Sequence, residues 1–358
     1  MIIESLELKD FRNYSLASFE FDSGTNVIYG DNAQGKTNIL EAIYLGAMTK
    51  SHRGSRDPEL IRFGQEEAHI RMFFCKNSVR HKIDLHLRKN KGKGIAVDGI
   101  PIKRASELIG TLHVVFFSPE DLNIIKNGPS ERRKFLNSEI SQMDRIYYSN
   151  LADYNKVLQQ RNQLLKDIYF RPSLMPTLDV WDQQLVHYGS RIIESRAAYI
   201  KELAEVVKGL HSKLTGGREE IEISYEPDVT IEEFPEKLSK ARETDLKFHT
   251  TSAGPHRDDF KVMTDGMDVR HFGSQGQQRS AALSLKLSEI DFVEKKTGDT
   301  PILLLDDVLS ELDRSRQGMV LSEIRKGQTF ITCTGMDELI ENNYPMNKIF
   351  HISRGNLI

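Results

Sequence analysis

The sequence predicts an α/β fold in which one domain is split by a helical insertion, so that its two sequence halves must meet in space. Three observations lead to this prediction. A glycine-rich loop at residues 30–37 follows a short apolar run, and a continuous apolar run at residues 302–305 ends in two carboxylates. Such runs are typical of parallel strands covered on both faces. Between these features lie about eighty residues with helical periodicity. We therefore expect the domain at residues 1–117 and 219–358, and the insertion at 118–218.

Composition excludes several classes of protein. The chain has 358 residues, of which 39% are hydrophobic and 28% charged, as is ordinary for soluble globular proteins of about two domains. It has no apolar run near 18–20 residues and no export signal at its start, so we expect no membrane span and no secretion. Two cysteines, Cys75 and Cys333, cannot build a disulfide framework, which favours a reducing cytoplasm. The net charge of −3 by itself argues against a polyanionic partner.

Periodicity locates the elements of the split domain. Alternating apolar and polar residues predict half-buried strands. These strands are expected near residues 5–9, 19–22, 69–75, 83–87, 95–97, 221–225, 260–262 and 329–332. A helix is expected from Asn38 to Lys50, because Ile39, Ile43 and Ala47 recur at spacings of four.

The insertion is predicted to be helical. Helix starts are expected at Ser118-Pro119 and at Gly128-Pro129, because proline is favoured in a first helical turn. Two long apolar stripes are separated by a break at residues 172–176, and the second runs from Asp179 to Leu214, about 54 Å at 1.5 Å per residue. We expect an antiparallel hairpin that projects from the body. The alternative is the core of an all-α domain, which the narrow stripes and charged outer faces disfavour.

The loop after the first apolar run fits the pattern G-x-x-x-x-G-K-[ST]. It consists of Gly30, Asp31, Asn32, Ala33, Gln34, Gly35, Lys36 and Thr37. Glycines let a backbone wrap closely around phosphate, and the N–H groups at the start of the following helix attract an anion. Lys36 would add a full charge beside the outer phosphates of ATP, and the Thr37 hydroxyl could ligate Mg²⁺. The context, strand before and helix after, is the one that this motif requires, whereas a chance glycine-rich turn would not need it.

Two further segments bear on the same chemistry. Asp306 ends the predicted strand at 302–305, where ligands bind in open α/β sheets, and would hold Mg²⁺; Asp307 would polarise the attacking water. The alternative is a solvated acidic turn after a buried strand. Downstream of the insertion, Ser274 is a good helix N-cap and Gly276 permits close backbone approach, which suggests a second anion site; the alternative is an ordinary polar loop.

These elements, with Ser310 to Asp313 as a fourth, resemble in their order the ABC-type ATPases, and within them the SMC-like branch. Further blocks are similar to the bacterial members of that branch that act in recombinational repair. These blocks are Leu8–Tyr14, Ser51–Arg53, Phe117–Leu122, Pro129–Leu136 and Gly254–Asp259. The resemblance implies an ATPase head with a short arm, a cytoplasmic and nucleoid-associated protein, and action at gapped DNA with RecO and RecR to help load a recombinase.

The resemblance also implies a dimer that closes around ATP. Ser274, Gly276 and Gln277 would reach ATP bound to the other subunit, and Arg12 and Asn13 would touch the nucleotide. The interface would contain Ser274, Gln275, Gly276, Gln277, Ser310 and Asp313. Asp307 stands where many ABC-type proteins have Glu, which is one methylene longer, so we expect weak, DNA-stimulated hydrolysis that acts as a switch. Two rival functions stay open: a transport-type cassette, and an ATP-gated dimerisation module without significant hydrolysis.

The overall charge conceals a basic segment. Residues 76–104 contain nine Lys or Arg against Asp84 and Asp98, a local charge of +7. Such clustering is typical of phosphate-backbone binding. The candidate DNA contacts are Arg80, Lys82, Arg88, Lys89, Lys91 and Lys93. The alternative is a solvated, lysine-rich hairpin that blunts a sheet edge.

Overall fold

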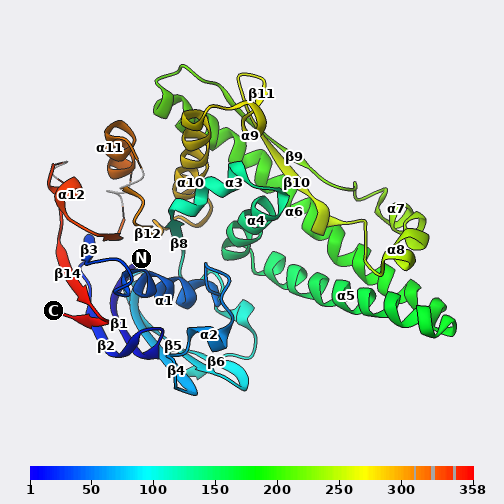
Figure 1. Cartoon of the computed structure of the whole chain (residues 1–358), viewed down its shortest axis with the longest axis horizontal. Helices are drawn as coiled ribbons and strands as arrows, with labels where there is room; N and C mark the ends of the chain where they lie inside the picture. The colour runs from blue at the N-terminus through cyan, green and yellow to red at the C-terminus, as the bar shows by residue number, and fades with distance from the viewer. Residues whose placement is uncertain (310–311, 324–326, 342–343) are drawn as a thin grey trace. The chain divides into compact units, whose positions relative to one another are not determined.

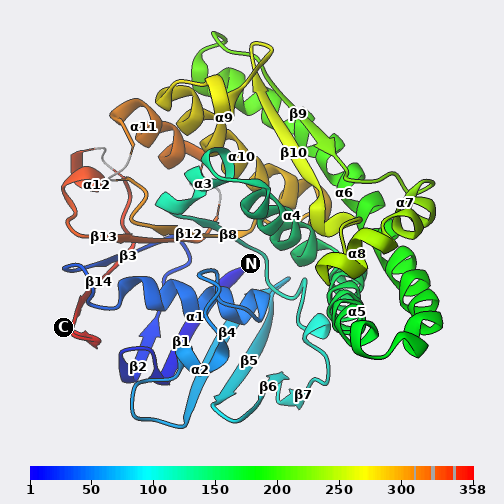
Figure 2. The ribbon, with the colours of Figure 1, turned by 45° about the vertical axis from the view of Figure 1, so that its right-hand side comes forward.

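In the computed structural model, strands from the two ends of the sequence pair in one sheet (Figures 1 and 2). Its order is β15 (Asn356–Leu357), β14 (Lys348–Ser353), β3 (Thr25–Tyr29), β13 (Thr329–Cys333), β12 (Ile302–Asp306) and β8 (Val114–Phe117). All neighbours are parallel except β15, which is antiparallel to β14. The two sequence halves therefore share one sheet, as the predicted α/β fold requires.

The structure describes residues 1–309, 312–323, 327–341 and 344–358. It divides into two units, the first made of Met1–Asp121 with Glu289–Ile358 and the second of Leu122–Ser288. The chain thus changes unit at Asp121/Leu122 and Ser288/Glu289, whereas the sequence suggested 117/118 and 218/219. The second boundary differs because a small sheet that follows the long helices packs against them.

Helix α1 (Lys36–Met48) lies between the parallel sheet and an antiparallel sheet within the first unit (Figure 2). The antiparallel order is β2 (Tyr14–Glu20), β1 (Ile2–Phe11), β4 (Glu67–Lys76), β5 (Val79–Arg88), β6 (Lys91–Val97) and β7 (Ile100–Pro101). Because sheets cover α1 on two sides, Leu40 and Leu45 are buried together with the predicted stripe of Ile39, Ile43 and Ala47. Burial of nearly the whole helix also encloses the charge of Glu41.

Short helices complete the first unit. They are α2 (Asp57–Leu60), η1 (Ala105–Glu107), η2 (Pro119–Leu122), α11 (Arg314–Glu323) and α12 (Asp337–Glu341), η2 ending one residue past the boundary. The helix start expected at Ser118-Pro119 is thus a short 3₁₀ turn. Among the helices that the structure describes, none has the length and apolar character needed to cross a membrane.

The second unit contains the predicted helical hairpin. Helices α5 (Arg145–Phe170) and α6 (Leu178–Thr215) pack along each other and are joined by η3 (Pro172–Thr177). Helix α6 ends at Gly216, whose φ of 65° lies in the left-handed region that favours glycine. Helix α4 (Pro129–Met143) begins at the expected proline.

The hairpin is not isolated, nor is its unit all-α. A sheet ordered β11 (Met267–Asp268), β10 (Asp259–Thr264) and β9 (Ile221–Glu226) packs against α4 and α6. The remaining elements are α3 (Asn123–Lys126), α7 (Phe234–Lys240), α8 (Arg242–Phe248), η4 (Pro255–Arg257), α9 (Val269–Phe272) and α10 (Gln275–Thr297), which begins in this unit. Helices α7 and α8 contact α6 and α5 respectively, so both long helices are partly covered.

Candidate functional site

The glycine-rich loop between β3 and α1 has the conformation that its motif requires. Gly30 and Gly35 have φ values of 149° and 112°, and a Cβ on Gly30 would lie 2.3 Å from the Ile352 carbonyl oxygen. Lys36 curls over the loop, where its Nζ donates hydrogen bonds to the carbonyl oxygens of Gly30 at 2.5 Å and Asp31 at 2.9 Å. The N-cap of α1 is Gly35, which has no side chain to cap the helix. The N–H groups of its first turn can therefore bind an anion.

Asp306 lies beside this loop. Its Oδ1 accepts hydrogen bonds from the hydroxyls of Thr37 at 2.7 Å and Thr332 at 2.8 Å. Asp307 follows with a left-handed φ of 54°, and its N–H donates to the Thr332 hydroxyl at 3.0 Å. Residues some 270 positions apart meet here because β3, β13 and β12 are parallel neighbours whose carboxyl ends lie at one edge.

A cavity of about 190 Å³ holds these groups. It is lined by Asn32, Ala33, Gln34, Gly35, Lys36, Thr37, Asn38, Arg53, Asp306, Asp307 and Thr332. Six of the eight predicted loop residues, from Asn32 to Thr37, thus share one cavity with both predicted carboxylates, whereas Gly30 and Asp31 do not line it. Hydroxyl and carboxylate oxygens 2.7 Å apart, at Thr37 and Asp306, are the hard donors that Mg²⁺ prefers. The residues present therefore fit that ion.

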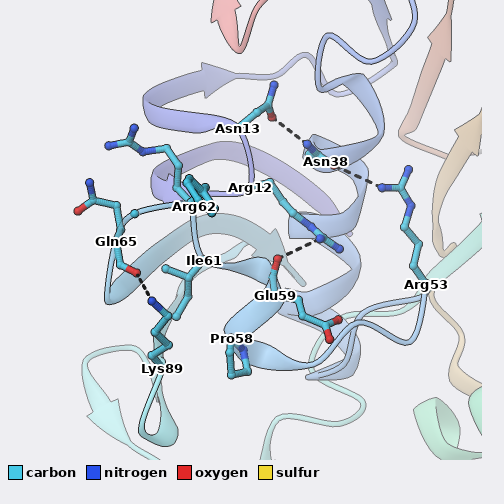
Figure 3. A pocket seen from close by; sticks show the side chains of 12 residues that line it. Arg12, Asn13, Asn38, Arg53, Pro58, Glu59, Ile61, Arg62, Gln65 and Lys89 are labelled. Atoms are coloured by element: carbon cyan, nitrogen blue, oxygen red, sulfur yellow. Dashed lines mark hydrogen bonds between the residues drawn. The ribbon is translucent and has the colours of Figure 1, made fainter.

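A second, larger cavity of about 720 Å³ shares Asn38 and Arg53 with the first (Figure 3). Its wall combines apolar and basic side chains from the segment after α1. The lining residues are Arg12, Asn13, Asn38, Arg53, Pro58, Glu59, Ile61, Arg62, Phe63, Gly64, Gln65 and Lys89.

Sequence patterns did not single out residues 57–65, which form one short helix and a turn without periodicity. Thr332 was also missed, although a polar residue at the carboxyl end of a predicted strand was a usable signal.

Arg12 and Asn13 both brace the loop and α1. Asn13 Nδ2 donates to the Gln34 carbonyl oxygen at 2.8 Å. Arg12 binds the buried Glu41 through two hydrogen bonds of 2.8 Å, and its guanidinium also donates to Ser55. Burial by itself raises the pKa of Glu41, but the hydrogen bonds from Arg12 and Ser51 lower it below its usual value. The sequence predicted that Arg12 contacts the nucleotide. In the structure its guanidinium forms hydrogen bonds to other groups of the protein, and direct contact with the nucleotide stays a prediction.

The second predicted anion site lies in the other unit, at the start of α10. Ser274 Oγ accepts the Gln277 N–H at 3.2 Å, and the Gln277 side chain accepts the Ser274 N–H at 2.9 Å. This reciprocal capping box confirms Ser274 as the N-cap. Gln275 and Gly276 are exposed beside it. Of the other proposed interface residues, Asp313 is exposed and caps α11 through the Arg316 N–H, whereas Ser310 lies outside the described residues.

The basic segment is partly neutralised by acids from elsewhere in the first unit. Five of its nine cations are ion-paired: Lys76 with Asp299, Arg80 with Glu4, Lys89 with Glu66 and Lys93 with Asp57, whose acids lie outside the segment, and Lys82 with Asp84 inside it. Arg88 donates to the Gly92 carbonyl oxygen. Lys91 is exposed on β6, and its side chain has no hydrogen bond or ion pair with the residues that the structure describes. The local charge of +7 therefore overstates the positive field of this surface.

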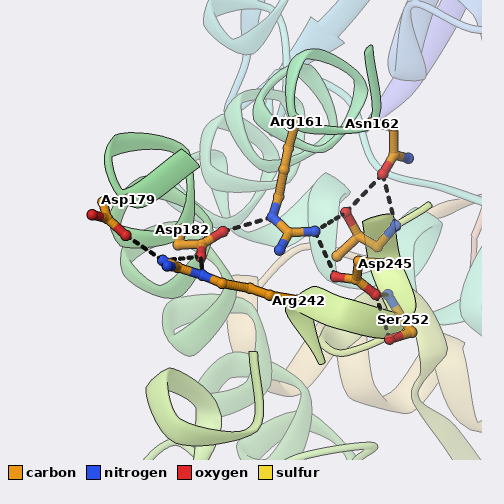
Figure 4. Close-up of polar contacts among 8 residues, drawn as sticks. Arg161, Asn162, Asp179, Asp182, Arg242, Asp245 and Ser252 are labelled. Carbon is orange, nitrogen blue, oxygen red and sulfur yellow. Dashed lines mark hydrogen bonds and ion pairs between the residues drawn. The ribbon is translucent and has the colours of Figure 1, made fainter. Parts of the chain in front are cut away.

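Buried arginines organise the second unit. Arg161 is fully buried and donates to Asp182 at 2.6 Å and to Asp245 at 2.7 Å, which joins α5, α6 and α8 (Figure 4). Arg242 shares Asp182 from the outer side. These are scaffold contacts, because the acceptors are side chains of the same unit.

The block around His256 is also part of this scaffold. His256 bonds with its two ring nitrogens to the Tyr154 hydroxyl at 2.7 Å and to the Thr251 carbonyl oxygen at 3.0 Å. Asp258 is buried against Arg196, whose Nη1 donates to it at 2.8 Å. The contacts of His256 are therefore those of a structural residue.

Comparisons with known proteins identify the family of the chain. Residues 2–356 match the model of the family described as "RecF/RecN/SMC N terminal domain". The "DNA replication and repair protein RecF" of Lachnospira eligens is 56% identical, with 100% of this chain and 99% of that protein covered. A solved structure of "the recombination mediator protein RecF-ATP in RecFOR pathway" has 38% identity and a TM-score of 0.92, covering 100% of this chain and 97% of the other. An Smc head domain from Pyrococcus furiosus has a TM-score of 0.56 at 17% identity, covering 99% of this chain and 94% of its own, which shows the fold alone.

The Arg12–Glu41 pair gives a test of how α1 is held. Arg12→Ala leaves the Glu41 charge buried without its cation, so the free energy of unfolding should fall by about 3–5 kcal/mol at pH 7. Because the folded pKa of Glu41 is lowered, its stabilising contribution is present above the unfolded value, about 4.3, and is lost as pH falls through the folded value. The difference between wild type and variant should therefore shrink in acid. Denaturant titrations across pH 3–7 measure this difference. The control is Arg62→Ala, which breaks the more exposed pair with Asp10 and should change the free energy of unfolding by about 0–1 kcal/mol.

The Arg161 network should stabilise the second unit. Arg161→Ala leaves Asp182 with only the outer cation and removes the one ion-pair partner found for the fully buried Asp245 among the described residues. We expect the free energy of unfolding to fall by about 3–5 kcal/mol. Lys208→Ala, at a pair with Glu220 whose two side chains are 60% exposed, should change it by less than about 1 kcal/mol. Equal losses in the two variants would contradict the assignment.

Proposed function

Because the chain belongs to the RecF/RecN/SMC N-terminal domain family, we propose that it is an ATP-dependent DNA-binding protein of recombinational repair and replication. The observation that carries the proposal is the meeting of Lys36, Thr37 and Asp306 at the glycine-rich loop. Relatives named for replication and repair cover the whole chain, and one related structure is named for bound ATP. ATP binding would close a homodimer on DNA, and slow hydrolysis would reopen it.

The two adjoining cavities suggest how ATP lies. The smaller one, with Lys36 and the start of α1, suits the phosphates. The larger one, which continues past Asn38 and Arg53, suits the nucleoside. Its Ile61 and Phe63 offer apolar contact to a base, and Phe63 is 99% exposed. Arg53 lines both cavities and so would lie where the nucleoside meets the phosphates.

Asp306 and Asp307 would divide the chemistry. Thr37 and Asp306 would hold Mg²⁺, which supplies charge stabilisation to the phosphates when it is bound. Asp307 would accept a hydrogen bond from the attacking water and orient it. Thr332 holds the Asp306 carboxylate and the Asp307 backbone, since its hydroxyl donates to Asp306 Oδ1 and accepts from the Asp307 N–H. The shorter side chain at position 307 is our reason for expecting slow turnover.

The rest of the proposal concerns partners. Ser274, Gln275, Gly276 and Gln277 are exposed or partly exposed at the start of α10, as an anion site completed by a second copy requires. With Asp313 and Ser310 they would form the dimer interface. RecR and RecO are the proposed protein partners, in keeping with the RecFOR pathway named for a related structure. The proposed DNA structure is a single-strand gap or a junction of single and double strands.

The ATP proposal predicts different outcomes for Lys36 and Asp307. Lys36→Ala should abolish ATP-dependent dimerisation, because the phosphates lose their cation. Asp307→Asn should keep ATP binding but prolong the dimer, since hydrolysis is impaired. Sedimentation velocity with and without ATP, repeated with gapped DNA, measures both, and Asp179→Asn, an exposed carboxylate of the second unit, is the control.

Two outcomes would favour other functions, and a third would contradict slow hydrolysis. An unchanged dimer lifetime in Asp307→Asn would favour a dimerisation module without significant hydrolysis. ATPase activity that does not respond to DNA would favour a transport-type cassette. Turnover at tens per second would contradict the switch.

The DNA proposal is best tested at Lys89 and Lys91. Lys93 is unsuitable, because its ammonium bonds the Thr49 carbonyl oxygen and Asp57 beside α1. The double variant Lys89→Glu/Lys91→Glu should weaken DNA binding independently of sequence, and the slope of log K against log salt should fall by about 1 per lost phosphate contact. Lys208→Glu on α6 is the control. Unchanged DNA affinity and slope would move the DNA site elsewhere.

A further inference from the structure

Three side chains with metal-ligating atoms, none of which lines either nucleotide cavity, converge on the outer face of the antiparallel sheet. His69 on β4 lies directly opposite His86 on β5 in the strand register. Glu67 precedes His69 by two residues, so its side chain lies on the same face. The opposite face of β4 is buried through Ala68 and Ile70, which leaves this trio toward solvent.

The donor atoms are close enough for one small cation. Glu67 Oε2 is 2.7 Å from His86 Nε2 and 3.8 Å from His69 Nε2. One ligand atom of each residue lies within 4.8 Å of the other two. In a tetrahedral zinc site with metal–ligand distances of 2.0–2.1 Å, two ligand atoms lie about 3.3 Å apart. The distances from Glu67 Oε2 to the two Nε2 atoms lie on either side of that value. The imidazole rings stack with centroids 4.2 Å apart, and the Nε2 atom of each lies near Glu67 Oε2.

The scaffold holds these donors in place. Strands β4 and β5 pair over their whole length, and each has a further neighbour, β1 and β6 respectively. The backbone positions of Glu67, His69 and His86 are therefore fixed by a six-stranded sheet. Only side-chain rotation is needed to bring the three ligand atoms to equal distances.

We propose that Glu67, His69 and His86 form a surface site for Zn²⁺ or a similar borderline divalent cation. Two imidazole nitrogens and one carboxylate oxygen are a donor set that zinc accepts, with the fourth position left for water. Lys9 lies opposite His69 on β1, and Arg88 lies opposite Glu67 on β5. These cations and the missing fourth protein ligand make the site weaker than a four-ligand structural zinc site. A bound ion would link β4 to β5, and the inference does not depend on ATP chemistry.

The experiment is calorimetric titration of the full chain with Zn²⁺ alone, in a buffer without chelator, nucleotide or DNA. The wild type should bind one ion at this site and melt at a higher temperature with zinc present. His69→Gln and His86→Gln should each weaken this binding about tenfold or more, because a ligand is lost. Glu67→Gln keeps both imidazoles and should also weaken it.

The matched control is His81→Gln, on the same strand as His86. The Nδ1 atom of His81 contacts Asp98 instead of the trio. It should leave zinc affinity unchanged. Melting curves without zinc check that all four variants are folded. Equal zinc affinity in wild type and the His69 and His86 variants would place the metal elsewhere. No binding to the wild type would leave the trio as an ion pair with a stacked imidazole; either result overturns the proposal.

Discussion

The structure of the first unit depends on one buried ion pair, between Arg12 and Glu41. Helix α1 is enclosed by two sheets, and Glu41 is fully buried within it. A buried carboxylate without a cation would be costly, so the turn that carries Arg12 must lie against α1. That contact brings Asn13 onto the glycine-rich loop, where it bonds the Gln34 backbone. The buried charge of Glu41 thus helps to fix the position of the loop, because it requires Arg12, and with it Asn13, to lie beside α1.

The parallel side supplies the other half of the site. Because β12 and β13 are neighbours in register, Asp306 and Thr332 are paired positions at the carboxyl ends of their strands. Strand β3 adjoins β13 and delivers the loop to the same edge. The Thr37–Asp306 hydrogen bond joins residues that are 269 positions apart in sequence. Helical elements of any length can be inserted between them without disturbing this meeting, since sheet pairing alone aligns the strand ends.

Charge in this protein has to be assessed on the folded surface. The segment 76–104 is strongly basic in sequence, yet β5 and β6 place its cations beside Glu4, Glu66 and Asp57. Partners from distant parts of the chain convert a single-sign run into a mixed surface, whose long-range field is weaker. The antiparallel sheet also gathers Glu67, His69 and His86, a grouping that strand pairing creates and that spacing along the sequence does not reveal.

Local patterns in the sequence determined much of this protein. The loop Gly30–Thr37, the strand before Asp306, the cap at Ser274 and the long helices were all predictable, because each depends on neighbours within a few residues. Tertiary structure alone decided the rest. The wall at residues 57–65, the role of Thr332 and the neutralised lysines depend on contacts between distant segments. The second boundary moved to Ser288 for the same reason: whether β9 and β10 pack against α6 or join the first unit is settled by side-chain packing over long sequence separations, which periodicity does not encode.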